Sequence, residues 1–126
     1  MFRYLFNKLK IITYDNYYVH GDESNLILLD KKSCGLSNTL FNTSSGKITI
    51  GRNVIFGHNC MVLTGYHDYK KNIHFVPCKG FDINIGSNCW ICSGAIIVGG
   101  VSIPDDSLVK AGEVIYRKLK VDGNGR

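Results

Sequence analysis

One histidine lies in a segment whose residue types favour acid–base chemistry. His67 and Asp68 are neighbours in the polar and aromatic run Gly65–Lys71. Imidazole titrates near neutrality, so His67 can accept a proton from an attacking hydroxyl or amine. The carboxylate of Asp68 can orient that imidazole or contact a substrate. These residue types make His67 a candidate for acid–base chemistry and Asp68 a candidate for orienting it or contacting a substrate, with an ordinary loop histidine as the alternative for His67.

The other histidines have weaker claims on chemistry. His74 follows in the same segment and is interpreted either as a residue that binds the acceptor or as a solvated side chain. His58 and His20 are interpreted as structural. A nucleophilic pair of Cys60 and His67 is a minor alternative, because Cys60 occupies an inward position of the repeat described below.

The cysteines bear on compartment and on metal binding. Five cysteines is an odd number, and no secretory signal precedes them. This combination predicts reduced thiols and a cytoplasmic protein. Cys89 and Cys92 form a CxxC motif, but there is no second CxxC and no histidine pair at zinc-finger spacing. We therefore expect no metal.

The net charge of +5 is spread over most of the chain, which disfavours a nucleic-acid surface. One basic concentration, Arg117, Lys118 and Lys120, suits the phosphates of a ligand such as coenzyme A, and equally suits a solvated tail.

The start of the chain has apolar side chains at helical spacing with basic residues between them. This pattern predicts a short N-terminal helix over 1–12, with contact to a membrane surface as the less favoured alternative. No apolar run approaches the length of a membrane span.

A repeat with a period of six is the strongest signal in the sequence. Aliphatic residues open six consecutive blocks, at Ile85, Ile91, Ile97, Ile103, Val109 and Ile115. Earlier blocks open at Ile50, Phe56 and Val62. The fifth position is small or β-branched at Val54, Cys60, Cys89, Ala95, Val101 and Ser107, although Glu113 breaks this rule. Asn53, Asn59, Asn88 and Asp106 occupy turn positions.

A period of six fits neither a helix nor a plain strand, but it fits a short strand followed by a turn. Three such units make one triangular coil of about 18 residues, whose strands pair in parallel with those of the next coil. The sequence therefore predicts an all-β, left-handed parallel β-helix, in which the aliphatic residues stack inside the prism.

The repeat is interrupted between about Thr64 and Asp82. The spacing from Ile50 to Ile85 is one position short of a multiple of six, so the phase slips here. We expect a loop ejected from the prism, and loops on rigid scaffolds commonly carry function. The predicted organisation of this single domain is an N-terminal helix (1–12), first coils (14–64), an active-site loop (65–82), last coils (83–118) and a tail (119–126).

The motifs resemble those of the hexapeptide-repeat acyltransferases, closest to the galactoside and maltose O-acetyltransferases and their relatives in surface-polysaccharide synthesis. The similarity covers about residues 44–118. The stretches that carry it are Ser45–Val54, Leu63–Tyr69, Ile83–Ile91, Ser93–Ile97 and Gly99–Val101.

The resemblance implies roles for individual residues. It makes His67 the catalytic base and Asn38 an acceptor-binding residue, beside Asp68 and His74. The residues that the resemblance implies for binding acetyl-CoA are Trp90, Ser93, Ala111, Tyr116, Arg117 and Lys118. It also implies a homotrimer with active sites between subunits.

The expected function is acetyl transfer from acetyl-CoA to a hydroxyl of a sugar or nucleotide-linked sugar, without a metal. Three alternatives stay open: N-acetylation of an amino sugar, a carbonic anhydrase on the same fold, and a non-catalytic trimeric scaffold. The histidine spacing does not fit the second. The third is favoured by the absence of the family's closing Gly-x-Pro segment, and Cys92 and Pro104 also depart from the family pattern.

Overall fold

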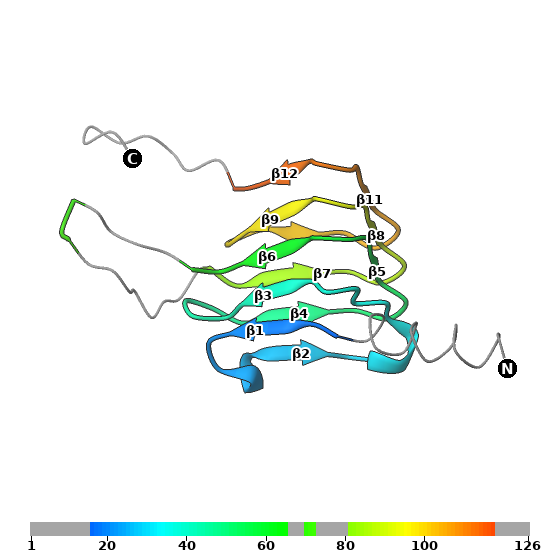
Figure 1. Cartoon of the computed structure of the whole chain (residues 1–126), viewed down its shortest axis with the longest axis horizontal. Coiled ribbons are helices and arrows are strands. Elements are labelled where there is room, and N and C mark those ends of the chain that lie inside the picture. Colours follow the sequence, from blue (N-terminus) through cyan, green and yellow to red (C-terminus); the bar gives the residue numbers. More distant parts are fainter. Residues whose placement is uncertain (1–15, 66–69, 73–80, 118–126) are drawn as a thin grey trace, which may run out of the picture.

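The computed structural model describes residues 16–65, 70–72 and 81–117. Within these ranges the chain winds through three sheets, each made of parallel strands, which form the three faces of a prism (Figure 1). This is the arrangement of a left-handed parallel β-helix, so the predicted fold class is confirmed. The predicted helix over 1–12 lies outside the described residues.

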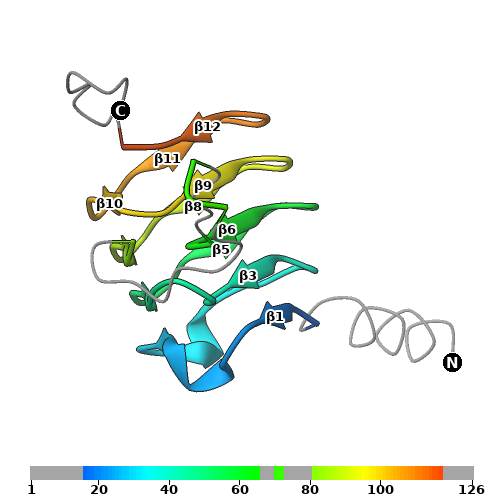
Figure 2. The same ribbon diagram turned by 90° about the vertical axis from the view of Figure 1, so that its left-hand side faces the viewer.

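Each face is one ladder of parallel strands. Face 1 contains β1 (Tyr18–His20), β3 (Leu40–Asn42), β6 (Met61–Leu63), β9 (Ile96–Val98) and β12 (Val114–Ile115). Face 2 contains β2 (Leu26–Leu28), β4 (Ile48–Ile50), β7 (Ile83–Ile85) and β10 (Ser102–Ile103). Face 3 contains β5 (Ile55–Phe56), β8 (Trp90–Ile91) and β11 (Leu108–Val109), and Gly35 extends it through a bridge to Ile55. The view in Figure 2 shows the coils stacked one on another.

The strand register gives the length of each coil. Asn84 pairs with Ser102 and Trp90 pairs with Leu108, so a regular coil is three blocks of the repeat long. Met61 pairs with Ile96, and the number of residues between these partners is almost twice that of a regular coil. This coil therefore holds an insert nearly as long as a regular coil. The insert leaves the prism after β6 and returns before β7, and the strand pairing of the sheets on either side of it is not interrupted.

The core is the stack of inward side chains that the repeat predicts. The opening residues Ile85, Ile91, Ile97, Ile103 and Val109 are all buried, as are the fifth-position residues Val54, Cys60, Cys89, Ala95 and Val101. The predicted turn residues Asn53, Asn59, Asn88 and Asp106 all have positive φ. Such angles are cheaper for Asn and Asp than for most other residues, which explains their place at the corners.

The first coil departs from the regular repeat. Two 3₁₀ turns, η1 (Glu23–Asn25) and η2 (Lys31–Ser33), lengthen it, so Ile27 pairs with Thr49 and not with a residue three blocks further on. Asp22 caps η1 by accepting hydrogen bonds from the N–H and hydroxyl of Ser24, which lower the pKa of its carboxyl. In the described part of the chain, neither helical turn has the length of a membrane span.

Candidate active site

The insert leaves the prism at the corner between faces 1 and 2, which we call the loop corner. Thr64 is the last residue before the exit and is fully buried. Its N–H and its hydroxyl both donate to the carbonyl oxygen of Asn42 in the coil below, at 2.9 and 2.8 Å. The N–H of Ser45 donates to the same hydroxyl at 3.1 Å. The exit point is therefore fixed to the coil beneath it.

The side chain of Asn42 lies beside this exit. Its Oδ1 accepts hydrogen bonds from the N–H and the hydroxyl of Ser44, at 2.9 and 2.5 Å. These contacts orient the amide so that Nδ2 faces Gly65, where a Cβ would come within 2.9 Å of it. Neither Asn42 nor Ser44 was predicted as a site residue.

The chain returns to the same corner at Asp82. Its Oδ1 accepts from the N–H of Lys47 in the coil below, at 2.8 Å. Its carbonyl oxygen accepts from the N–H of Gly100 in the coil above, at 3.1 Å. Asp82 was also missed, because its contacts depend on strand register rather than on local sequence.

The candidate base and its neighbours are not among the described residues. His67, Asp68, His74 and Lys118 all lie outside the ranges that the structure describes, and their roles remain predictions. The position that the structure does give is that of Thr64, which precedes His67 by three positions in the chain.

Two of the predicted cofactor residues, Ser93 and Ala111, lie at the corner between faces 3 and 1, and a third, Trp90, lies on the adjoining face 3. Trp90 begins β8 and is 61% exposed. The Ser93 hydroxyl accepts from the N–H of His58 at 3.0 Å, and the Ser93 carbonyl accepts from the N–H of Gly112, next to Ala111, at 2.9 Å. Ala111 is exposed one coil above Ser93. The structure thus brings these residues together along one edge of the prism.

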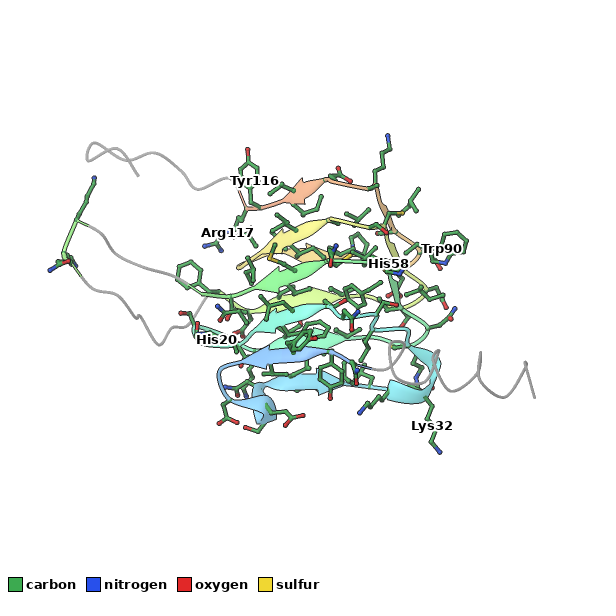
Figure 3. The ribbon with its side chains drawn as sticks, viewed as in Figure 1. His20, Lys32, His58, Trp90, Tyr116 and Arg117 are labelled. Atoms are coloured by element: carbon green, nitrogen blue, oxygen red, sulfur yellow. The ribbon has the colours of Figure 1, made fainter. Side chains whose placement is uncertain are left out.

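Tyr116 and Arg117 lie elsewhere in the same chain. They follow β12 on the side from which the loop emerges, whereas Trp90 and His58 lie on the opposite side (Figure 3). The predicted cofactor residues therefore form two groups at different corners. One chain does not bring them together.

Asn38 lies at the same corner as Ser93 and Ala111, between faces 3 and 1. It turns the chain from face 3 into face 1 with a φ of 56°, and its N–H donates to the carbonyl oxygen of Asn16 at 2.7 Å. Within one chain it is therefore at a different corner from the loop.

Cys89 of the CxxC motif and Cys60 are both buried in the prism. Cys89 is buried, and its thiol donates to the carbonyl oxygen of Pro104 at 3.2 Å, as expected of a packing residue. Cys60 is also buried, and burial raises the pKa of its thiol. A raised pKa keeps Cys60 protonated near neutral pH, which argues against the alternative of a Cys60 nucleophile because the thiolate is the reactive form.

Known proteins that resemble this chain are named as acetyltransferases. A Schizosaccharomyces pombe protein named as an acetyltransferase is 39% identical over 74 residues, covering 57% of this chain and 35% of the relative. The Escherichia coli galactoside O-acetyltransferase is 36% identical over 76 residues, covering 57% and 36%. An E. coli protein named as the colanic acid biosynthesis acetyltransferase WcaF is 28% identical over 108 residues, covering 86% and 50%.

The chain thus spans between about a third and a half of the length of these relatives. No family profile and no solved structure matches it. The similarity to acetyltransferases that the motifs predicted is confirmed.

Proposed function

We propose that this chain, a relative of the hexapeptide-repeat acetyltransferases, transfers an acetyl group from acetyl-CoA to a hydroxyl of a sugar or nucleotide-linked sugar. The observation that carries the proposal is the ejected loop, which leaves the prism at a fixed corner just before His67. The names of two relatives, a galactoside O-acetyltransferase and a colanic acid biosynthesis acetyltransferase, support a sugar acceptor.

In the proposed reaction, His67 acts as general base. The acceptor hydroxyl gives its proton to the imidazole as its oxygen bonds to the acetyl carbonyl carbon, and the proton then passes to the sulfur that leaves. Backbone N–H groups at a prism corner are the proposed donors to the oxyanion. No covalent enzyme intermediate and no metal are needed. Asp68, His74 and Asn38 are proposed to contact the acceptor.

Acetyl-CoA supplies the acyl group as a thioester, and the described residues fit its chemistry. The exposed indole of Trp90 offers a flat apolar wall, and the adjacent edge offers backbone groups at Ser93 and Ala111. Tyr116 and Arg117, with Lys118, would meet the phosphates of the nucleotide.

Binding of acetyl-CoA is the first test of this proposal. At about 100 times its dissociation constant, the ligand should stabilise the wild type by roughly 2.7 kcal/mol, which a thermal shift measures. Replacing Trp90 by alanine should weaken binding at least about tenfold, because it removes the aromatic wall. The Asn84→Ala variant on face 2 should bind normally. A wild type that acetyl-CoA does not stabilise would favour the scaffold alternative.

The assembly we propose is a homotrimer with active sites between subunits. The outward side chains Ile55, Trp90 and Leu108 stack in register on face 3 and are 46%, 61% and 58% exposed. In the outward row of face 2, Ile27 is followed by the polar residues Thr49, Asn84 and Ser102. A second copy on face 3 would cover the apolar row, and it would bring a loop corner towards Trp90. This contact would unite the two groups of cofactor residues.

A charge on the apolar row should disrupt this trimer. In Leu108→Asp, assembly would bury an unpaired carboxylate, so we expect the association constant to fall at least about tenfold. Light scattering after size-exclusion chromatography gives the mass. Ser102→Asp places the same charge on exposed face 2 and should leave the trimer intact. A monomeric wild type, or equal masses for both variants, would refute this interface.

We also propose a cytoplasmic location, where acetyl-CoA is available and free thiols stay reduced. In the described part of the chain the free cysteines are Cys34, Cys60, Cys89 and Cys92.

A further inference from the structure

Equivalent positions at the loop corner form a column through successive coils. The column contains Gly21, Thr43, Thr64 and Gly99, because the residues just before them pair in register. The two threonines bond alike to the coil below. The N–H of Thr43 donates to the His20 carbonyl, and its hydroxyl donates to the Asp22 carbonyl, both at 2.8 Å. Thr64 donates both its N–H and its hydroxyl to the one carbonyl of Asn42, and only Thr64 stands where the loop begins.

The returning segment of the loop packs between two glycines. A Cβ on Gly46, in the coil below, would lie 2.8 Å from the carbonyl carbon of Phe81. A Cβ on Gly99, in the coil above, would lie 3.0 Å from the carbonyl oxygen of Phe81 and 3.2 Å from its Cβ. Phe81 therefore fills the space that a side chain at Gly99 would take. A larger residue at Gly46 or Gly99 would displace the returning backbone.

Both ends of the loop are thus fixed to the same short stretch of the coil below. Asn42 and Ser45 hold the outgoing end through Thr64, and Lys47 holds the returning end through Asp82. Two attachments, on neighbouring backbone segments of a rigid prism, set both the position and the direction in which the loop departs.

We infer that Thr64, Gly46, Asp82 and Gly99 form a loop clamp whose role is to position the loop for catalysis. This inference rests on the proposed function, because the group that the clamp would aim is His67. Thr64 is a positioning residue, since within the described residues its hydroxyl bonds only to backbone of the coil below. A displacement of about 1 Å in a catalytic group can lower a rate about 100-fold.

Thr43 offers a matched control for Thr64. Both are buried, both donate a hydroxyl hydrogen bond to the coil below, and valine has nearly the same shape as threonine. Each valine variant loses the hydrogen bond that its hydroxyl donates, and Thr64→Val also loses the bond that the Ser45 N–H donates, so the rates are compared at a temperature where both variants are fully folded. We expect Thr64→Val alone to lower kcat, by about 10- to 100-fold, with an unchanged KM for acetyl-CoA. Thr64→Ser, which keeps the hydroxyl, should restore most of the rate. The assay uses acetyl-CoA with methyl β-galactoside and, in parallel, glucosamine.

A second readout does not depend on activity. Lys70 and Lys71 are exposed within the loop, so trypsin cleavage there reports how firmly the loop is held. Thr64→Val should be cut several-fold faster than Thr43→Val and the wild type, and Thr64→Ser at the wild-type rate. Equal cleavage of the two valine variants overturns the clamp, as does equal kcat in an active enzyme. Faster cleavage of Thr64→Val, together with a wild type that is inactive and is not stabilised by acetyl-CoA, supports the clamp and refutes the proposed function instead.

Discussion

Replacing His67 by alanine should lower kcat for acetyl transfer by about 10²- to 10⁴-fold, the usual contribution of a general base. The loss should fall on kcat, because the imidazole acts on the acceptor proton as the new bond forms. Steady-state kinetics with acetyl-CoA and methyl β-galactoside measure both constants. Stabilisation by acetyl-CoA should be the same in the variant and the wild type, because the cofactor residues are untouched.

The control for this variant is His58→Ala. His58 is an exposed histidine at the corner between faces 3 and 1, and its imidazole has no role in the proposed reaction. It should retain the wild-type kcat. Full activity of His67→Ala would show that another group accepts the proton. A trace of activity restored by added imidazole would instead support the assignment, because the free base would replace the missing side chain.

Replacing Phe41 by alanine should cost roughly 3–5 kcal/mol of unfolding free energy, which makes it the most destabilising single change that we expect. Its ring is fully buried at the centre of the lower coils. It meets Tyr17 edge-on at 5.9 Å and Phe56 at 5.6 Å between ring centroids. The neighbouring backbone ladders are rigid, so they cannot collapse into the cavity that the truncation leaves.

Urea denaturation at a fixed protein concentration measures this loss, since assembly would otherwise contribute to the apparent stability. Thr49→Ala is the control, because Thr49 lies on the outward row of face 2 and should cost less than about 1 kcal/mol. A loss at Phe41 similar to that at Thr49 would mean that the aromatic stack adds little to the prism.

The core could be predicted from sequence because each of its positions depends on residues that are close in the chain. An aliphatic residue at every sixth position and a small residue at the fifth position of each block fix which side chains point inward, as at Ile97 and Val101. The exception at Glu113 also has a local cause. Its side chain is exposed, and its carboxylate accepts a hydrogen bond from the N–H of Lys110 at 2.9 Å.

The site could be predicted only in part, because it depends on which corner a residue reaches. Each block of the repeat advances the chain by one face, so residues three blocks apart stack at the same corner, as Ser93 and Ala111 do. Trp90 and Tyr116 are separated by about one coil and one further face, and therefore lie at different corners. Their grouping by resemblance alone concealed this separation.

The residues that hold the loop could not be found without the register. The contact between Asn42 and Thr64 does not follow from a period of six, because the coil that separates them is longer than three regular blocks. The first coil is equally irregular, and its two 3₁₀ turns have no counterpart in the hexapeptide pattern.

The uninterrupted ladders around the loop have a consequence for how such a protein can diversify. β6 and β7 keep their partners above and below although the insert between them is nearly as long as a regular coil. The sequence of the insert can therefore change with little effect on the strand pairing that holds the prism together. Natural selection can rewrite the segment between Thr64 and Asp82 while the prism stays the same, and under the proposed function such changes would alter the choice of acceptor. A protein engineer can replace that segment with another, provided that Thr64, Asp82, Gly46 and Gly99 are retained.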